Sequence, residues 1–336
     1  MDDSLDITRA LDPARADIYF ARSLETLQHA GRDAQVTMEV CAGRAGVLCG
    51  MHEAQALLKT VLPAGAEVWA LHEGETMAAR EVVLRISAAY ASFGLYETTL
   101  LGMLASESGW ATAARSIVDA AAPVPVTCFG ARHVHPDVSA RMEYAAIIGG
   151  CVTGATPAGA ALAGQKAAGT MPHALVLIFG DTLEAARAFD AAIPDEVARV
   201  VLVDTFKDEA EEALRVAHAL GDRLYGIRLD TPSERGRVTP ELVHEVRARL
   251  DQAGFRHVQI TVSGGLTPDR IATFKETAAP VDSYAVGSYI SGASPIDFTG
   301  DIKVIDGRPI AKRGRIPGLT DSPRLQPVDL SAYRED

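Results

Sequence analysis

The sequence contains few cysteines and no long apolar stretch. Its four cysteines are Cys41, Cys49, Cys128 and Cys151, and no two of them form a Cys-x-x-Cys pair. Neither a zinc ribbon nor a disulfide framework is therefore indicated. No apolar run approaches the ~20 residues that a membrane span needs, and the acidic N-terminus lacks the apolar core of a signal peptide. We expect a cytoplasmic protein with reduced thiols and no membrane partner.

Positive charge is also scarce. The chain carries 32 Lys and Arg against 44 Asp and Glu, which gives a formal net charge of −12. A nucleic-acid-binding protein needs a basic face that displaces counterions, so we expect no nucleic-acid partner. The one basic run, residues 311–315, is more typical of a solvated surface turn. An anionic substrate would require the cations to gather in one pocket.

The N-terminal third of the chain mixes helix and strand signals. Apolar residues at helical spacing predict helices, and β-branched runs bounded by Gly predict strands. Expected helices cover 17–31, 52–61 and 95–120, and expected strands cover 35–42, 46–50, 67–72 and 81–87. We therefore assign residues 1–115 to a smaller α/β domain.

From residue 124 onward, short β-branched runs alternate with amphipathic helices. The expected strands are 124–129, 174–179, 198–205, 223–230, 257–264 and 283–288, and the expected helices include 182–193, 208–220, 239–253 and 267–277. Such alternation predicts βα units around a parallel sheet, here an irregular (β/α) barrel. We assign residues 116–292 to this barrel and 293–336 to a C-terminal extension that packs back on the N-terminal domain.

Charged residues and glycines recur where the barrel strands end, which is where a barrel carries its site. Taken singly, an Asp, Ser or Gly there is more often a helix cap than a catalytic group. Arg228 and Asp230 are different, because they flank Leu229 on one face of a strand and a buried ion pair is costly without a purpose. The strand-end positions are Arg132, His133, Asp204, Arg228, Asp230, Ser263, Gly264, Gly265, Gly287 and Ser288.

These positions belong to a series of short motifs that runs through most of the chain. The series comprises Asp17-Ile18-Tyr19-Phe20, Glu73-Gly74-Glu75, Tyr96-Glu97-Thr98, Phe129-Gly130-Ala131-Arg132, Ile148-Gly149-Gly150, Gly169-Thr170-Met171-Pro172-His173-Ala174, Val203-Asp204-Thr205-Phe206, Ile227-Arg228-Leu229-Asp230 and Val262-Ser263-Gly264-Gly265. In this order the motifs resemble the nicotinate phosphoribosyltransferase family, especially its compact archaeal and bacterial branch. The resemblance implies a split α/β domain, an irregular α/β barrel, and a homodimer with sites between subunits.

The resemblance also implies an activity in NAD synthesis. Nicotinate would receive a phosphoribosyl group from phosphoribosyl pyrophosphate (PRPP), through a pentosyltransferase that is classed as a ligase when it is coupled to ATP. By analogy, Asp230 supports the cationic ribose ring and Arg228 contacts ribose or phosphate. Asp204 is the candidate for hydrated Mg²⁺, which needs few protein ligands. The 5′-phosphate would be bound by backbone N–H groups around Ser263, Gly264, Gly265, Gly287 and Ser288.

For the pyridine ring, the resemblance implies two aromatic walls, Phe129 and, from the partner subunit, Tyr19. Arg132 matches the residue that faces the carboxyl group. Cys151 stands where relatives that use nicotinamide have an Asp, which favours the acid over the amide. Quinolinate has two carboxylates, and it should demand a denser cluster of cations than Arg132, His133 and His135 provide.

His173 matches a family histidine that is phosphorylated by ATP, so ATP is a candidate second cofactor. The alternative is a neutral His that is hydrogen-bonded at a strand end. Because His173 precedes the apolar run 174–179, we expect it at the start of a strand or turn. His133 and His135 lie beside Asp137 and resemble a metal pair, but no third ligand has a suitable spacing, so loop or phosphate contacts are preferred.

Three other functions compete with nicotinate phosphoribosyl transfer. A quinolinate phosphoribosyltransferase has a similar fold and adds the loss of CO₂. A (β/α)₈ phosphate-binding isomerase or aldolase leaves the first 110 residues unexplained, and no Lys lies at a strand end for its chemistry. A non-catalytic paralogue that binds PRPP or phosphate would have no need to keep Asp204, Arg228 and Asp230 together.

Overall fold

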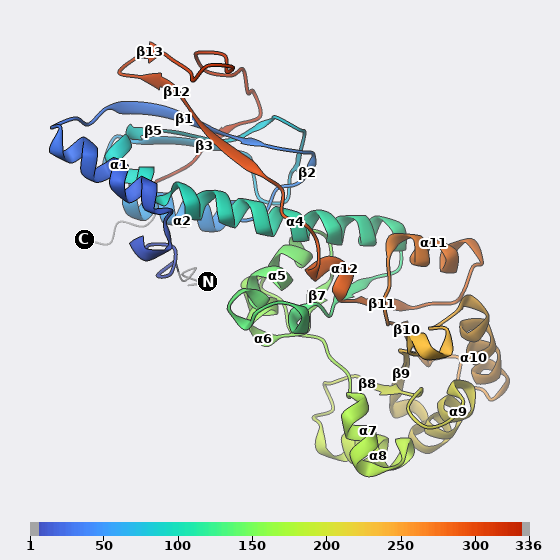
Figure 1. Cartoon of the computed structure of the whole chain (residues 1–336). Coiled ribbons are helices and arrows are strands. Elements are labelled where there is room, and N and C mark those ends of the chain that lie inside the picture. The colour runs from blue at the N-terminus through green and yellow to red at the C-terminus, as the bar shows by residue number, and fades with distance from the viewer. Residues whose placement is uncertain (1–6, 331–336) are drawn as a thin grey trace. The chain divides into compact units, whose positions relative to one another are not determined.

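The computed structural model describes residues 7–330 and divides the chain into two compact units (Figure 1). The first unit combines the described residues up to Thr112 with those from Ala293 onward, and the second unit is Ala113–Gly292. The boundary near residue 112 falls inside the 25-residue helix α4 (Glu97–Ala121). The chain thus leaves the first unit, builds the second, and returns to complete the first.

The first unit is built on a six-stranded antiparallel sheet with the order β13-β12-β1-β5-β3-β14. Its strands are β1 (Gln35–Ala42), β3 (Glu67–Ala70), β5 (Val82–Ala89), β12 (Phe298–Ile305), β13 (Arg308–Pro309) and β14 (Gln326–Pro327). Because β1 pairs with β5 on one side and with β12 on the other, the C-terminal segment supplies a long strand of this sheet. A separate two-stranded ribbon joins β2 (Gly46–Val47) and β4 (Thr76–Met77).

The helices of the first unit contribute to its apolar core. They are η1 (Pro13–Arg15), α1 (Ile18–His29), α2 (Met51–Val61), α3 (Tyr90–Phe93), η2 (Gly94–Tyr96) and the first part of α4. Val40 and Leu84 from the sheet are fully buried in one cluster with Leu57 of α2 and Phe93 of α3. The predicted helices 17–31, 52–61 and 95–120 are confirmed as α1, α2 and α4 with small shifts of their ends.

The second unit is built on a six-stranded parallel sheet with the order β7-β6-β11-β10-β9-β8. Its strands are β6 (Val126–Cys128), β7 (Thr153–Gly154), β8 (Arg199–Leu202), β9 (Leu224–Leu229), β10 (Gln259–Val262) and β11 (Ser283–Val286). The sheet curls into a half-barrel, and within residues 7–330 no strand joins β7 to β8. The predicted irregular α/β barrel is confirmed in this open form.

One predicted strand of the second unit was wrong, because the apolar run 174–179 forms a helix. The helices of this unit are the rest of α4, η3 (Ala131–His133), α5 (Pro136–Ile148), α6 (Pro157–Leu162), α7 (His173–Phe179), α8 (Thr182–Ala192), α9 (Glu209–Leu220), η4 (Gly221–Arg223), η5 (Ser233–Arg235), α10 (Pro240–Gln252), α11 (Pro268–Glu276) and α12 (Ser288–Ser291). Periodicity cannot separate strand from helix in a short apolar run. The signal that could have corrected the prediction is Gly180, which ends α7 with a left-handed φ of +73°.

Local capping signals fix where the helices after β9 and β10 begin. Thr239 accepts a hydrogen bond from Leu242 N and Thr267 accepts one from Arg270 N, each at 3.3 Å. A proline occupies the first helical position in both α10 and α11, where its missing N–H has no cost. Among the described helices, none combines the length and the apolar character needed to cross a membrane.

Candidate active site

Four charged side chains from two strand ends and one helix meet at the carboxyl edge of the half-barrel. Arg228 lies in β9, Asp230 directly follows β9, Asp204 lies just beyond β8, and His173 is the first residue of α7. Arg228 Nη2 donates to Asp230 Oδ2 at 3.3 Å. His173 Nε2 lies 3.5 Å from the same oxygen and 3.7 Å from Asp204 Oδ2. Arg228 and Asp230 therefore do face the same side of their strand.

Asp230 is surrounded by groups that favour its ionised form. Ser263 Oγ donates to Asp230 Oδ1 at 2.8 Å, on the side of the carboxylate away from Arg228. Burial disfavours the charge, but the interactions with His173, Arg228 and Ser263 outweigh burial and lower the pKa of Asp230. The carboxylate is thus a fixed negative charge at the strand end.

Arg228 is nearly buried and its direction is fixed from two sides. Its Nη1 donates to Thr170 Oγ1 at 2.7 Å, opposite the bond from Nη2 to Asp230. Its Cζ lies 5.6 Å from the centre of the Phe129 ring, within cation–π range. Its Nε has no hydrogen-bond partner within the described part of the chain. The sequence marks Thr170 only as part of a motif, because its contact with Arg228 spans 58 positions.

Asp204 is a buried carboxylate without a hydrogen bond in the described residues. Its side chain is 0% exposed, and neither of its oxygens has a hydrogen-bond partner among residues 7–330. Burial raises the pKa of Asp204 to about 6, although the nearby His173 acts in the opposite direction. Buried polar atoms are almost always hydrogen-bonded, so two free oxygens in one carboxylate point to a ligand that completes the site. A hydrated divalent cation fits such oxygens.

His173 connects the two carboxylates. Its Nδ1 lies 3.0 Å from Thr205 Oγ1, while Nε2 faces Asp204 and Asp230. The hydrogen bond with Asp230 raises the pKa of His173, and this effect outweighs burial. The sequence placed His173 at the start of a strand or turn. The structure instead places it at the start of a helix, with its imidazole in the charged cluster.

The glycine loop after β10 lies beside Asp230. Gly264 and Gly265 both have left-handed backbones, with φ of +91° and +61°. A Cβ at position 264 would lie 3.0 Å from Asp230 Oδ1. The N–H groups of Gly264 and Gly265 donate to no acceptor in the described residues. They form an edge of free donors next to the charged cluster, as a phosphate would require.

The neighbouring strand β11 ends at the second predicted phosphate loop. Gly287 follows β11, and exposed Ser288 begins the four-residue helix α12. A Cβ at position 287 would lie 2.8 Å from both the Phe129 carbonyl oxygen and His133 Cε1. Gly287 is therefore needed for the close approach of these two segments.

The residues predicted to contact the pyridine ring are distributed over both units. Phe129 follows β6, and Arg132 is exposed in η3. Cys151 is only 3% exposed, and burial beside Cys128 raises the pKa of its thiol well above the ordinary value, so it carries no charge. Tyr19 belongs to α1 of the first unit and is 56% exposed.

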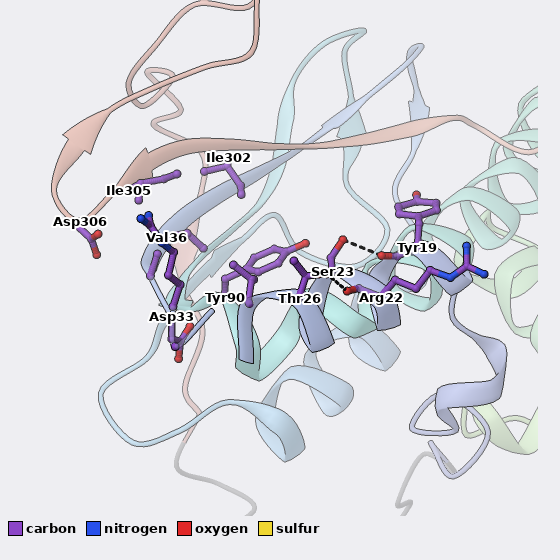
Figure 2. A pocket seen from close by; sticks show the side chains of 14 residues that line it. Tyr19, Arg22, Ser23, Thr26, Asp33, Val36, Tyr90, Ile302, Ile305 and Asp306 are labelled. Atoms are coloured by element: carbon purple, nitrogen blue, oxygen red, sulfur yellow. Dashed lines mark hydrogen bonds between the residues drawn. The ribbon is translucent and has the colours of Figure 1, made fainter. Parts of the chain in front are cut away.

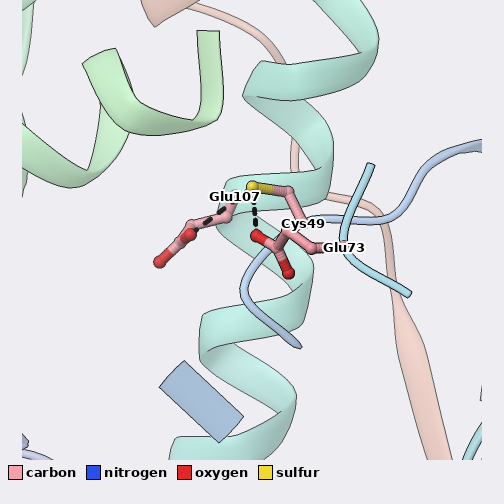
Figure 3. Close-up of side chains that lie close together, drawn as sticks. All are labelled: Cys49, Glu73 and Glu107. Carbon is pink, nitrogen blue, oxygen red and sulfur yellow. Dashed lines mark hydrogen bonds between the residues drawn. The ribbon is translucent and has the colours of Figure 1, made fainter. Parts of the chain in front are cut away.

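Within the described residues, His133 and His135 belong to no group of three or more metal-type ligands. His135 Nδ1 accepts a hydrogen bond from Asp137 N at 3.2 Å and caps α5. Within residues 7–330, a cluster of metal-type ligands is formed by Cys49, Glu73 and Glu107 in the first unit (Figure 3). These three residues were not singled out as ligands in the sequence.

The Cys49 cluster has a structural role. Cys49 Sγ lies 3.1 Å from Glu73 Oε1 and 3.6 Å from Glu107 Oε2. Glu73 accepts hydrogen bonds from Gly50 N at 2.9 Å and Met51 N at 2.7 Å, so its carboxylate satisfies the N-terminus of α2. Burial raises the pKa of Cys49 well above the ordinary value, which keeps the thiol a neutral donor.

The first unit also contains a groove of about 910 Å³ beside α1, lined by Arg22, Val36, Tyr90 and Ile302, with Tyr19 at one end (Figure 2). Charged side chains such as Arg22, Asp33 and Asp306 line it together with apolar side chains such as Val36 and Ile302. The groove has no cluster of interacting acids and bases like the one around Asp230. The carboxyl edge of the half-barrel is therefore the candidate active site.

Known proteins resemble both units. The family model of the quinolinate phosphoribosyl transferase C-terminal domain matches residues 110–301, and that of the N-terminal domain matches residues 17–108. A nicotinate phosphoribosyltransferase of Mycobacterium tuberculosis is 30% identical over 249 residues, which cover 72% of this chain and 52% of that protein. This chain thus spans about half the length of the curated nicotinate phosphoribosyltransferases it matches.

Two further relatives are named nicotinate-nucleotide pyrophosphorylases. The crystal structure of nicotinate-nucleotide pyrophosphorylase from Pyrococcus furiosus is 42% identical with a TM-score of 0.85, covering 91% of this chain and 79% of that one. A probable carboxylating nicotinate-nucleotide pyrophosphorylase of Methanothermobacter thermautotrophicus is 24% identical and covers 89% of this chain and 99% of that protein.

Proposed function

Because the chain belongs to the quinolinate phosphoribosyl transferase family, we propose that it is a phosphoribosyltransferase of NAD synthesis that uses nicotinate. The products would be nicotinate mononucleotide and pyrophosphate. The observation that carries the proposal is the cluster of Asp204, Arg228, Asp230 and His173 beside a glycine loop with free N–H groups. Quinolinate as the substrate is the alternative, since the P. furiosus protein is named nicotinate-nucleotide pyrophosphorylase.

The proposed reaction moves a ribosyl group from oxygen to nitrogen. The bond from C1′ to pyrophosphate oxygen breaks with its electron pair leaving on oxygen, and the lone pair of the pyridine nitrogen forms the new bond to C1′. The nucleophile needs no general base, so the chain must hold the reactants in line and stabilise positive charge on the ribose. Asp230 is suited to this task, because Arg228 and Ser263 hold it ionised and fixed in place.

Magnesium is the proposed cofactor, with Asp204 as its protein contact. The two free, buried oxygens of Asp204 suit a hydrated divalent cation. Magnesium bound there would neutralise charge on the departing pyrophosphate. Near neutral pH, a cation would also favour the ionised form of Asp204, whose pKa is raised to about 6 in its absence.

Coupling to ATP is proposed through His173. Its Nε2 lies between two carboxylates, and its Nδ1 is close to Thr205 Oγ1, so the ring orientation is fixed. A histidine phosphorylated at this position would stand next to the proposed magnesium and ribose contacts. Phosphorylation of His173 by ATP would thus be coupled to the binding of PRPP.

The choice of nicotinate rests on the charges available for the ring. Arg132 is an exposed cation on the segment that follows β6, close enough for its charge to act on Arg228. Cys151 is a neutral buried thiol, so it offers no acceptor for the amide of nicotinamide. Arg228 is already bound to Thr170 and Asp230, so its guanidinium is not free for a second carboxylate of quinolinate.

The decisive experiment incubates the protein with PRPP, Mg²⁺ and one of three bases: nicotinate, nicotinamide or quinolinate. Mononucleotide and CO₂ are identified by mass. Nicotinate should be used roughly 30- to 150-fold better than nicotinamide, since a bidentate Arg–carboxylate contact contributes ~2–3 kcal/mol. Product from quinolinate with release of CO₂ would establish the alternative. PRPP binding without turnover of any base would indicate the non-catalytic paralogue.

The proposed partner is a second copy of the chain. Tyr19 is exposed on α1, and the proposed role in the base pocket places it in the site of the partner subunit. Sedimentation velocity at assay concentration should therefore give a dimer or larger oligomer. An active monomer would remove Tyr19 from the base pocket.

A further inference from the structure

The loops that follow β9 and β10 contain two arginines that the chemistry above does not use. Arg237 lies between η5 and α10, and Arg270 is in the first turn of α11. Burial lowers the pKa of Arg270, and the charge of Arg237 lowers it further, so the two guanidinium groups are close enough to repel each other. Two neighbouring cations at the edge of a candidate active site suggest an anion that neutralises them.

Arg270 is committed to backbone carbonyls. Its Nη1 donates to Gly264 O at 2.7 Å and to Gly265 O at 3.0 Å, and its Nη2 donates to Val238 O at 2.9 Å. These bonds tie the loop after β10 to the loop after β9. They occupy the glycine carbonyls, while the N–H groups of the same two glycines stay without an acceptor in the described residues. Arg270 is thus a positioning residue for these donors.

Arg237, by contrast, has a free guanidinium. It forms no hydrogen bond or ion pair with any residue between 7 and 330. Hydrogen bonds from its own backbone N–H and from Ser233, the latter at 3.1 Å, lower the pKa of Glu234 on the same loop, and the charge of Arg237 adds a smaller lowering. The Nη1 atom of Arg237 lies against Gly265, where a Cβ would overlap it.

The backbone of Arg237 has an uncommon conformation. Its φ is +66°, in the left-handed region that residues other than glycine rarely adopt. Its N–H donates to Pro232 O at 3.1 Å, which holds this turn. Residues in such conformations concentrate at ligand-binding sites, where the surrounding structure maintains them.

We propose that Arg237 binds the phosphate on C5′ of the ribose substrate, together with the free N–H groups of Gly264 and Gly265. The inference deepens the proposed phosphoribosyl transfer and rests on it. A guanidinium fork matches two phosphate oxygens, and Gly265 leaves room for that fork directly over the loop. The diphosphate of PRPP has the same chemistry, and we assign it instead to the side of Asp204, where a cation would accompany it.

The test measures binding of two probes to the full-length protein by calorimetry: ribose 5-phosphate, and pyrophosphate with Mg²⁺. Arg237→Gln should weaken binding of ribose 5-phosphate at least about tenfold, since it removes charge-assisted hydrogen bonds. It should leave pyrophosphate binding within about twofold and raise the KM for PRPP more than it lowers kcat. Arg237→Lys should recover part of the binding, because it restores the charge without the fork.

Arg256→Gln is the matched control, because Arg256 is also exposed but precedes β10 and so lies at the opposite, amino edge of the sheet. It should bind both probes like wild type. An Arg237→Gln variant that binds ribose 5-phosphate within about twofold of wild type overturns the inference, and so does a loss confined to pyrophosphate. The wild-type protein could make no mononucleotide while Arg237→Gln still weakens binding of ribose 5-phosphate. In that case the proposed function fails and this phosphate subsite stands.

Discussion

The two units each contain a buried carboxylate, and they treat it in opposite ways. Glu39 of the first unit is 1% exposed, and Asp204 of the second is 8% exposed. Glu39 accepts two hydrogen bonds from Arg85, at 2.9 and 2.6 Å, and one from Thr320 Oγ1 at 2.7 Å. Neither oxygen of Asp204 has a hydrogen-bond partner in the described residues, and its charged neighbour His173 lies 3.7 Å away. Burial alone therefore does not identify a functional carboxylate, and Asp204 differs from Glu39 in lacking hydrogen bonds while it faces His173 at the strand ends.

The difference follows from position in the fold. Glu39 lies opposite Arg85 in the β1–β5 register, and the segment around Thr320 covers the pair. Asp204 lies beyond the end of β8, at the edge where loops leave the sheet. A buried ionised carboxylate without hydrogen bonds is unfavourable, so Asp204 is a local source of instability that Glu39 is not.

The largest effect is expected at Asp230. Asp230→Asn keeps the size of the side chain and removes the charge that supports the cationic ribose. We expect kcat for mononucleotide synthesis to fall about 100- to 1000-fold, or ~3–4 kcal/mol, with a smaller change in the KM for PRPP. Steady-state kinetics measure both, with exposed Asp269→Asn on α11 as the control. A folded variant with the wild-type kcat would exclude Asp230 from the chemistry.

The next effect is on stability and concerns the first unit. Glu39→Gln breaks a buried pair and leaves Arg85 without its counter-charge, so the free energy of unfolding should fall by about 3 kcal/mol. Urea unfolding measures this loss, and exposed Glu67→Gln in the same sheet is the control. The kcat of the folded variant should not change. A loss well below 1 kcal/mol would mean that the Glu39 pair is as dispensable as a surface ion pair.

Asp204→Asn should do the reverse, and stabilise the protein at pH 7 in the absence of Mg²⁺. The pKa of Asp204 in the folded protein is about 6, against an ordinary value of 3.8, so the folded state holds a proton more tightly than the unfolded chain. Its contribution to stability is present below about pH 4 and is lost as the pH rises through about 6. Removing the carboxylate should recover about 2 kcal/mol at pH 7.

Thermal unfolding between pH 4 and 7 measures the effect, and exposed Asp222→Asn in η4 is the control. The slope of stability against pH should be flatter in Asp204→Asn than in wild type. A less stable variant at pH 7 would show that the folded protein supplies Asp204 with favourable interactions, and the contrast with Glu39 would fail.

The smallest effect on basal synthesis is expected at His173. His173→Ala should abolish an acid-labile, base-stable phosphoenzyme formed from ATP, yet lower ATP-independent synthesis less than about tenfold, because Asp230 and Arg228 stay in place. Labelled ATP and product assays measure the two effects separately. A wild-type protein that never hydrolyses ATP would restrict His173 to binding or packing. Complete loss of basal synthesis in a folded variant would place it in the ribosyl transfer itself.

Much of the second unit is predictable from the sequence, because its signals are local. Alternation within β9 places Arg228 and Asp230 on one face, and Thr-Pro pairs mark the starts of α10 and α11. The apolar run 174–179 was the error, since such a run suits a strand and a helix equally. That error also hid the open side of the half-barrel between β7 and β8.

Residue spacing along the chain determined which groups share a strand face, where helices are capped, and where glycines allow left-handed loops. Those features depend on neighbours within a few positions, and backbone geometry fixes them. Only the tertiary structure decided that His173 meets Asp230, that Arg270 holds Gly264, and that Glu39 is hydrogen-bonded while Asp204 is not. These are contacts between segments distant in sequence, and whether a buried charge finds a partner depends on how the loops pack around it.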